Sequence, residues 1–243
     1  HKMGIHASPT CVLAFGDKGG AEGFMVGKPN EGLAAMFTMM NYMRLGVGAQ
    51  ATGLSERSYQ TSVSYARKRV RGRAPGVKGQ VAIIRHPDVR RMLLLMRSLT
   101  QASRAICYYT ASCLDRMAHG TDAEAAAKWQ ARAELMTPIA KAWCTEIGQE
   151  VTELGIQVHG GMGYVEETGI AQFYRDARIA SIYEGTNGIQ AIDLVGRKLL
   201  RDGGTTVAAF VSDMRAVDAP LANAGEDVAV VRQALARALD ELV

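Results

Sequence analysis

The chain has 243 residues, enough for one large domain or for one domain with part of another. Apolar residues make up 48% of it, which predicts a sizeable core and excludes extensive disorder. The net charge of +4 is mild, and the one dense basic run, RKRVRGR at 67–73, is typical either of a solvated helix end or of an anion site.

No apolar run approaches the roughly 20 residues that span a bilayer, and the opening HKMGIHASPT lacks the apolar stretch of a signal peptide. The four cysteines, Cys11, Cys107, Cys113 and Cys144, form no CxxC pair and have no histidine at ligand spacing. We therefore expect buried free thiols in a reducing, cytoplasmic compartment, with no metal site. Because the chain opens within strand-like sequence, we expect it to be a fragment.

Residues 1–29 differ from the rest of the chain. Two short apolar runs, Thr10–Gly16 and Glu22–Gly27, are separated by the turn-rich stretch DKGGA, and this pattern predicts a pair of β-strands. Two strands rarely form a stable unit alone. We therefore interpret residues 1–29 as the end of a β domain.

From residue 30 the pattern is helical. Asn30 can cap a first helix that runs to about Lys68. Four methionines recur along it at helical spacing and predict a buried stripe, with a Met-rich binding groove as the functional alternative: Met36, Met39, Met40 and Met43.

Two further long helices are predicted. The second begins at Pro87 and ends near Met117, before a glycine. Thr121 and Glu124 form a capping-box pattern for the third helix, which we expect to end near residue 153 because Gly155 interrupts the pattern. Shorter helices are predicted at about 170–178, 189–200, 207–216 and 226–242. Three long helices followed by a shorter one indicate an up-down bundle.

Two glycine-rich elements flank the short helix at 170–178: QVHGGMGY at 157–164 and YEGTNG at 183–188. Glycines let backbone N–H groups approach an anionic ligand, although turns between helices explain them equally well. No strand precedes the first element, so a dinucleotide-binding fingerprint is not supported. In the second, Glu184 is a candidate proton acceptor if Ile182, Tyr183 and Ile189 enclose it, and an ordinary surface charge if it is solvated.

Residues 157–190, QVHGGMGYVEETGIAQFYRDARIASIYEGTNGIQ, closely resemble the C-terminal signature of the acyl-CoA dehydrogenase family. Upstream, HKMGIHASPTCVLAFGD at 1–17 resembles the strand that ends the family's middle β domain. NEGLAAMFTMMNYMRLGVGAQATG at 30–53 resembles its first long C-terminal helix. The loop at 70–85 and the residues beyond 200 are most similar to the 3-methylmercaptopropionyl-CoA dehydrogenase branch.

The resemblance implies an all-α fold, an up-down four-helix bundle over residues 30–200. The end of the middle β domain would precede it at 1–29, and additional helices would follow at 201–243. It also implies FAD-dependent α,β-dehydrogenation of an acyl-CoA, with Glu184 as the base and its backbone N–H among the donors to the enolate oxygen. Some relatives carry the base one position before Arg44, where this chain has Met43, so Glu184 is the only candidate.

Further roles carry over from the family by position. Gly185, Asn41 and Arg44 match substrate-binding positions. FAD-binding positions are matched by Arg69, Gln157, Gly160, Gly161, Thr186 and Gly188, and Ser8 and Thr10 would lie near the flavin. The phenylalanine that usually follows Arg69 is absent. The resemblance implies a homodimer or homotetramer, with electron-transfer flavoprotein as the electron acceptor.

Two other interpretations use the same residues. An acyl-CoA oxidase would keep the same base and admit oxygen to the reduced flavin. A non-catalytic, DNA-associated relative would use the basic surface for nucleic acid, but the intact base motif and the mild charge weigh against a nucleic-acid partner. Because the family's N-terminal helical domain and most of its β domain have no counterpart here, we expect this polypeptide alone to be inactive and to bind FAD weakly or not at all.

Overall fold

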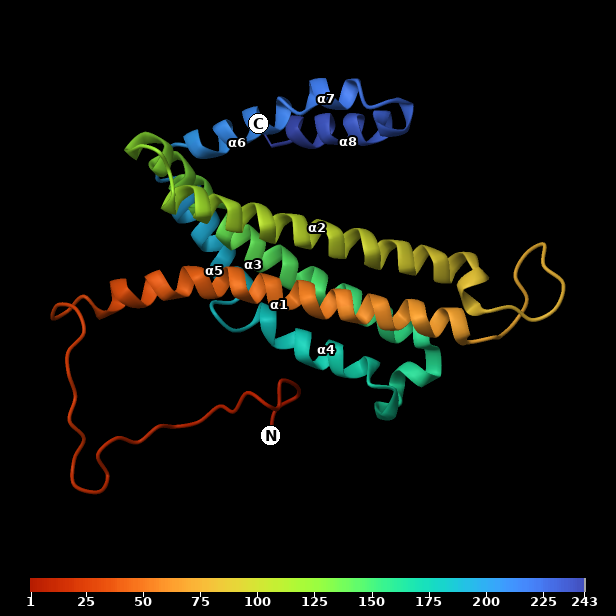
Figure 1. The fold of residues 1–243 in the computed structure, drawn as a ribbon, viewed down its shortest axis with the longest axis horizontal. Helices are drawn as coiled ribbons and strands as arrows, with labels where there is room; N and C mark the ends of the chain where they lie inside the picture. The colour runs from red at the N-terminus through yellow and green to blue at the C-terminus, as the bar shows by residue number, and fades with distance from the viewer. Residues whose placement is uncertain (243) are drawn as a thin grey trace. The chain divides into compact units, whose positions relative to one another are not determined.

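The computed structural model describes residues 1–242. It divides them into two compact units, one made of His1–Tyr109 and Ala140–Asn187, the other of Thr110–Ile139 and the chain from Gly188 onward. The helices are α1 (Gly32–Lys68), α2 (Pro87–Ala118), α3 (Ala123–His159), α4 (Ile170–Arg178), α5 (Asn187–Ile192, extended by π-helical turns over Asp193–Leu199), α6 (Thr205–Arg215), α7 (Asp218–Ala222) and α8 (Ala229–Asp240). The predicted all-α fold is confirmed (Figure 1).

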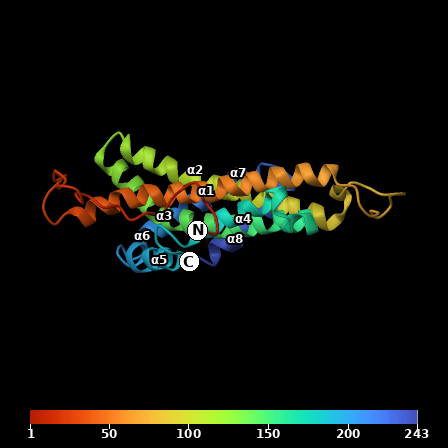
Figure 2. The same ribbon diagram turned by 90° about the horizontal axis from the view of Figure 1, so that it is seen from below.

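In the first unit, α1 and α4 lie side by side (Figures 1 and 2), and residues from α1, α2 and α3 share one core. That core comprises Ala66, Met92, Leu93, Met96, Ile147, Val151 and Val158. Among the helices of residues 1–242, none is both long enough and apolar enough to cross a membrane.

Helix α3 does not stop before Gly155, contrary to the prediction; it continues to His159. A Cβ at Gly155 would overlap the hydroxyl of Ser58 on α1, so this glycine serves a close approach between two helices. The predicted capping box is also wrong. The side chain of Asp122 caps the helix, accepting a hydrogen bond of 2.7 Å from the N–H of Ala125, as aspartate commonly does.

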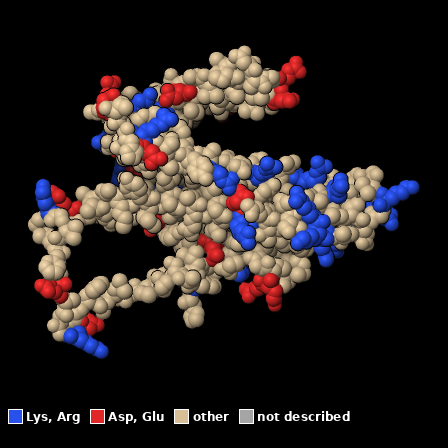
Figure 3. Space-filling view, viewed as in Figure 1, with Lys and Arg blue, Asp and Glu red and all other residues tan. Residues whose placement is uncertain are grey.

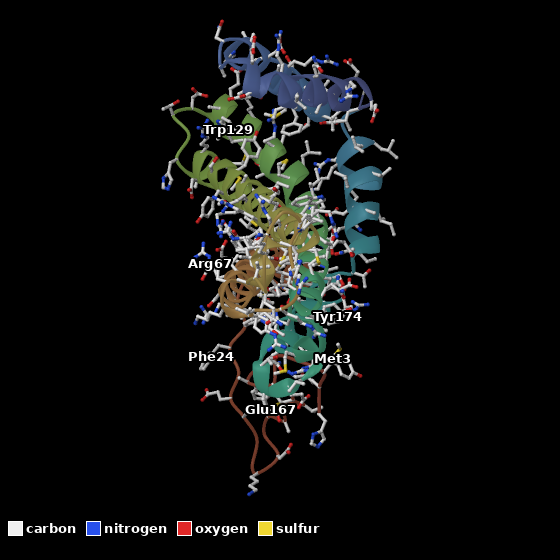
Figure 4. The ribbon with its side chains drawn as sticks, turned by 90° about the vertical axis from the view of Figure 1, so that its right-hand side faces the viewer. Met3, Phe24, Arg67, Trp129, Glu167 and Tyr174 are labelled. Carbon is white, nitrogen blue, oxygen red and sulfur yellow. The ribbon has the colours of Figure 1, made fainter. Side chains whose placement is uncertain are left out.

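The predicted strands at Thr10–Gly16 and Glu22–Gly27 are absent; within residues 1–242 the one β-bridge joins Val70 to Ala82. Residues 8–31 contain no helix or strand, and Phe24 lies on this coil with 83% of its side chain exposed (Figure 4). A strand needs a neighbour for its backbone hydrogen bonds, and two short runs bury too little apolar surface to supply one for each other.

The first residues of the coil are tied to α4. The N–H of Ile5 donates a hydrogen bond of 2.6 Å to the Asp176 carboxylate on α4. Gly4 lies so close to the carbonyl of Arg175 that a Cβ would come within 2.5 Å of its oxygen.

The predicted methionine stripe is not buried. Met36, Met39 and Met43 are 40%, 55% and 44% exposed, and Met40 is half-buried. Three of the four thiols are buried as predicted, whereas Cys11 lies exposed on the coil.

In the second unit, the predicted helix at 226–242 begins three residues later than predicted, as α8. Arg232 on α8 donates hydrogen bonds to both carboxylate oxygens of Asp218 on α7, at 2.6 and 2.7 Å.

The turn after α3 offers a test of close packing. Gly163 is buried, and a Cβ there would overlap the carbonyl oxygen of Ile156, a backbone atom that cannot rotate away. We expect Gly163→Ala to lower the free energy of unfolding by about 1–3 kcal/mol in urea titrations. Gly161→Ala, two residues away, meets nothing within 4 Å and should change it by less than about 0.5 kcal/mol. Equal effects of the two substitutions would contradict the close approach.

Candidate active site

The residues between α4 and α5 form a loop, 182–187, that we call the Glu184 loop. Glu184 has a φ of 57° and Gly185 a φ of 82°, so two consecutive residues adopt the left-handed conformation. For glycine this conformation is free of strain, whereas for a residue with a Cβ it costs about 1–2 kcal/mol. Such strain in a non-glycine residue is frequent at functional sites, where the surrounding structure holds it in place.

The loop is fixed to α1 on its N-terminal side. The Tyr183 hydroxyl donates a hydrogen bond to the side-chain oxygen of Gln50 on α1. Burial raises the pKa of Tyr183, and the negative charge of Glu184 adds to this effect. Just before the loop, the Ser181 hydroxyl accepts hydrogen bonds from Gln149 at 3.1 Å and from Arg178 at 3.0 Å.

On its C-terminal side, the loop is fixed to α3 through Asn187. The Asn187 side-chain oxygen accepts a hydrogen bond of 2.9 Å from the Lys141 ammonium. Its amide nitrogen donates to the Glu146 carboxylate at 2.6 Å and to the Thr145 hydroxyl at 3.1 Å. Glu184 is thus held between two anchored neighbours, Tyr183 and Asn187.

Two buried cations belong to this region. Arg44 on α1 is 6% exposed and Lys141 on α3 is fully buried. Burial, followed by repulsion from Arg44, lowers the pKa of Lys141 to about 8, while Glu146 and Glu184 act in the opposite direction. Sequence reasoning missed Lys141. The sequence held one indication of it: helical spacing puts Lys141 on the same face of α3 as a row of small residues, which is typical of a packed face. These residues are Thr137, Ala140, Cys144, Thr145 and Gly148.

The predicted apolar enclosure of Glu184 is only partial. Glu184 and Tyr183 are each half-buried, but Ile182 and Ile189 are each 46% exposed. Of the predicted substrate residues, Arg44 is buried, Gly185 half-buried and Asn41 exposed.

The remaining predicted site residues lie in different places. Thr186 is exposed in the Glu184 loop, and Gly188 is exposed in α5, at the start of the second unit's C-terminal segment. Ser8 and Thr10 are exposed on the N-terminal coil, without secondary structure.

The other four predicted cofactor residues come together at the far end of α1. A hollow of about 390 Å³ is lined by Arg69, which follows α1, and by Gln157, Gly160 and Gly161 at the end of α3; the remaining lining residues are Tyr65, Arg71, Ile83, Val158, His159 and Met162. Lys and Arg side chains gather on this end of the unit, where α1 ends and α2 begins (Figure 3).

This hollow combines positive charge with an open backbone, and such a lining could hold an anionic group. Arg69 and Arg71 supply positive charge, and a guanidinium can bond two phosphate oxygens at once. A Cβ at Gly160 or Gly161 would meet nothing within 4 Å, so the backbone there is open to a ligand. Of the two explanations for RKRVRGR, the geometry is compatible with an anion site.

Comparisons with known proteins show the family of the chain. Residues 30–200 match the family model described as acyl-CoA dehydrogenase, C-terminal domain. The chain is 49% identical over 240 residues to 3-methylmercaptopropionyl-CoA dehydrogenase of Ruegeria pomeroyi, covering 98% of this chain and 40% of that protein. It is 37% identical over 218 residues to the broad-specificity linear acyl-CoA dehydrogenase FadE5 of Mycobacterium tuberculosis, covering 86% and 35%.

Solved structures show the same likeness. Butyryl-CoA dehydrogenase from Megasphaera elsdenii superposes with a TM-score of 0.59 at 28% identity, over 71% of this chain and 40% of that one. An acyl-CoA dehydrogenase from Bacillus anthracis, complexed with FAD, gives a TM-score of 0.63 at 26% identity, over 81% and 33%. The chain belongs to the acyl-CoA dehydrogenase family. It spans about 40% or less of the length of the two curated relatives.

The strain at Glu184 predicts an ordering of variants. Glu184→Ala and Glu184→Gly both remove the carboxylate, but only glycine adopts a φ of 57° without strain. We expect the glycine variant to be more stable than the alanine variant by about 1 kcal/mol, measured by urea unfolding. An alanine variant as stable as the glycine variant would show that the loop relaxes out of the left-handed conformation.

His159 predicts a dependence of stability on pH. Its ring stacks on Tyr65 with centroids 4.2 Å apart, and burial lowers the pKa of His159 despite its 2.7 Å hydrogen bond to the Gly155 carbonyl. Below about pH 6.5 the unfolded chain therefore binds a proton that the folded chain resists, and stability falls as the pH falls. Urea unfolding at several pH values should show a shallower fall for His159→Phe than for the exposed-site control His6→Phe.

Proposed function

We propose that this chain is the C-terminal part of a FAD-dependent acyl-CoA dehydrogenase, with Glu184 as the base that removes the α-proton of an acyl-CoA thioester. The observation that carries the proposal is the strained, left-handed Glu184, held between anchors on α1 and α3. A solvated surface carboxylate requires neither the strain nor the anchors. Membership of the family supports the assignment.

The carboxylate of Glu184 takes the α-proton, and the electrons of that C–H bond form the Cα–Cβ double bond as the β-hydrogen leaves with its electron pair. A bound FAD supplies the acceptor for this hydride. The backbone N–H of Glu184 is a candidate donor to the thioester oxygen, which gains negative charge during proton removal. Gly185, which has no side chain, leaves room beside the thioester, and Arg44 and Asn41 lie on the helix that faces the substrate.

The hollow at the end of α1 and α3 would hold the diphosphate region of FAD through Arg69, Gln157, Gly160 and Gly161. In this proposal the FAD belongs to a neighbouring subunit, so the enzyme is a homodimer or homotetramer, with electron-transfer flavoprotein as electron acceptor. Residues 1–29 would complete the middle β domain, residues 30–200 form the helical bundle domain, and residues 201–243 add further helices.

The test is Glu184→Gln in the full-length, flavin-loaded enzyme. The amide cannot accept the α-proton, so reduction of the flavin by acyl-CoA should slow by about 10²–10⁴-fold in anaerobic stopped-flow experiments, while the flavin stays bound. Glu167→Gln, at an exposed position in the turn before α4 (Figure 4), should reduce its flavin at the wild-type rate. Normal bleaching of the flavin in Glu184→Gln would place the base elsewhere.

A panel of acyl-CoA thioesters would define the substrate. The 49% identity to 3-methylmercaptopropionyl-CoA dehydrogenase makes a thioether acyl-CoA the first compound to compare with unbranched chains. Oxygen consumption without an added electron acceptor would indicate an oxidase in place of a dehydrogenase.

A further inference from the structure

We propose that Cys107 and Cys144 form a redox-active pair, which a peroxide converts to a disulfide between α2 and α3. This inference goes beyond the proposed dehydrogenation and does not depend on Glu184. It assigns a modification site to two buried thiols that the sequence analysis interpreted only as free cysteines.

The two sulfurs lie together inside the first unit. The Sγ atoms of Cys107 on α2 and Cys144 on α3 are 3.8 Å apart, although 37 positions separate the two residues in the chain. A disulfide requires about 2.05 Å between its sulfurs. Because a cysteine side chain turns about a single torsion, a small adjustment on two neighbouring helices brings the thiols to bonding distance.

The surroundings limit how far either side chain can turn away from the other. The Thr52 hydroxyl on α1 lies 3.7 Å from the Sγ atom of Cys107, and a Cβ at Gly48 would lie 3.5 Å from the same sulfur. The Cys144 thiol donates a hydrogen bond of 3.6 Å to the carbonyl of Ser103 on α2. Three helices thus meet at the pair and hold its two sulfurs next to each other.

Access distinguishes the two thiols. Cys107 lines a hollow of about 330 Å³ between α1 and α2, together with Gly53 and Tyr108, whereas Cys144 has no exposed surface. A hydrogen bond from Cys144 lowers the pKa of Cys107 to about 7, although burial acts in the opposite direction, and the same interaction raises the pKa of Cys144. Since a thiolate is the reactive form, Cys107 is the thiol that a small oxidant entering the hollow reaches first.

The chemistry takes two steps. The Cys107 thiolate attacks one oxygen of hydrogen peroxide, and the O–O bond breaks to leave a sulfenic acid on Cys107 and, after protonation, one water. Cys144 then gives up its proton and its sulfur attacks the sulfur of Cys107. The S–S bond forms as the S–O bond breaks, and the departing hydroxide takes the proton to become a second water. Two thiols are oxidised, and one peroxide is reduced to two waters.

Two cysteines that only pack as small apolar residues would be equally buried, so the test asks which thiols react. The full-length holoenzyme, with oxidised flavin and without substrate, is treated with hydrogen peroxide, and its unreduced peptides are mapped by mass spectrometry. Cys113, which is buried on α2 but does not line the hollow, is the internal control. Chymotryptic cleavage after Tyr108 and Tyr109 separates it from Cys107.

We expect one pair of peptides joined through Cys107 and Cys144, lighter by two hydrogens than the separate peptides and split by dithiothreitol. Cys113 should remain a thiol, and Cys113→Ser should form the cross-link at the wild-type rate.

Two isosteric variants test the order of attack. In Cys144→Ser the sulfenic acid on Cys107 has no second thiol beside it, so dimedone should trap it. In Cys107→Ser we expect about tenfold less dimedone adduct on Cys144, because that sulfur is neither exposed nor readily ionised.

The wild-type map decides the inference without any variant. If both thiols are still reduced after a peroxide excess that oxidises cysteine in solution, the pair only fills space and the inference is wrong. Oxidation of Cys107 to a sulfinic acid without a cross-link would also overturn it. Equal dimedone labelling in the two serine variants would overturn the assignment of Cys107 as the thiol attacked first. None of these outcomes bears on Glu184, which is tested by flavin reduction.

Discussion

The close packing of α1 against α3 through small residues is the constraint on which the first unit depends. A Cβ at Gly48 would lie 3.1 Å from the carbonyl oxygen of Ala140, and one at Gly148 would lie 3.1 Å from the Cβ of Ala51. Gly155 continues the same contact at Ser58. The buried hydroxyls of Ser58 and Ser62 have no hydrogen-bond partner within the described chain, a cost that this close approach offsets by dispersion contacts along two long helices.

The proposed base and the proposed cofactor site lie at the two ends of this contact. At one end, where Gly48 approaches Ala140, the next residue of α3 is Lys141, whose ammonium donates a hydrogen bond to Asn187 at the end of the Glu184 loop. At the other end, Tyr65 of α1 stacks on His159 of α3, beside the hollow that contains Arg69. One helix interface thus positions both the proposed base and the proposed cofactor site, because rigid helices transmit their register over their whole length.

The apolar surfaces that the sequence predicted to be buried lie on the segments before this interface. Met36, Met39 and Met43 precede the first contact at Gly48, and the N-terminal coil precedes α1. The helical periodicity of the methionines identified them as one face of a helix, but periodicity cannot show whether that face is buried. Whether a face is covered depends on what packs on it, which no local pattern contains.

The sequence by itself determined where the long helices lie, because helical periodicity and breakers act over neighbouring residues. It also determined Glu184 as the candidate base, since its signature is continuous along the chain. Only the tertiary structure decided that Gly155 lies inside a helix. A glycine that ends a helix and a glycine that lets a second helix pack closely look identical in sequence. It alone revealed Lys141 beside the Glu184 loop and the left-handed backbone of Glu184, since the hydrogen bonds that fix the end of this loop join residues more than 40 positions apart.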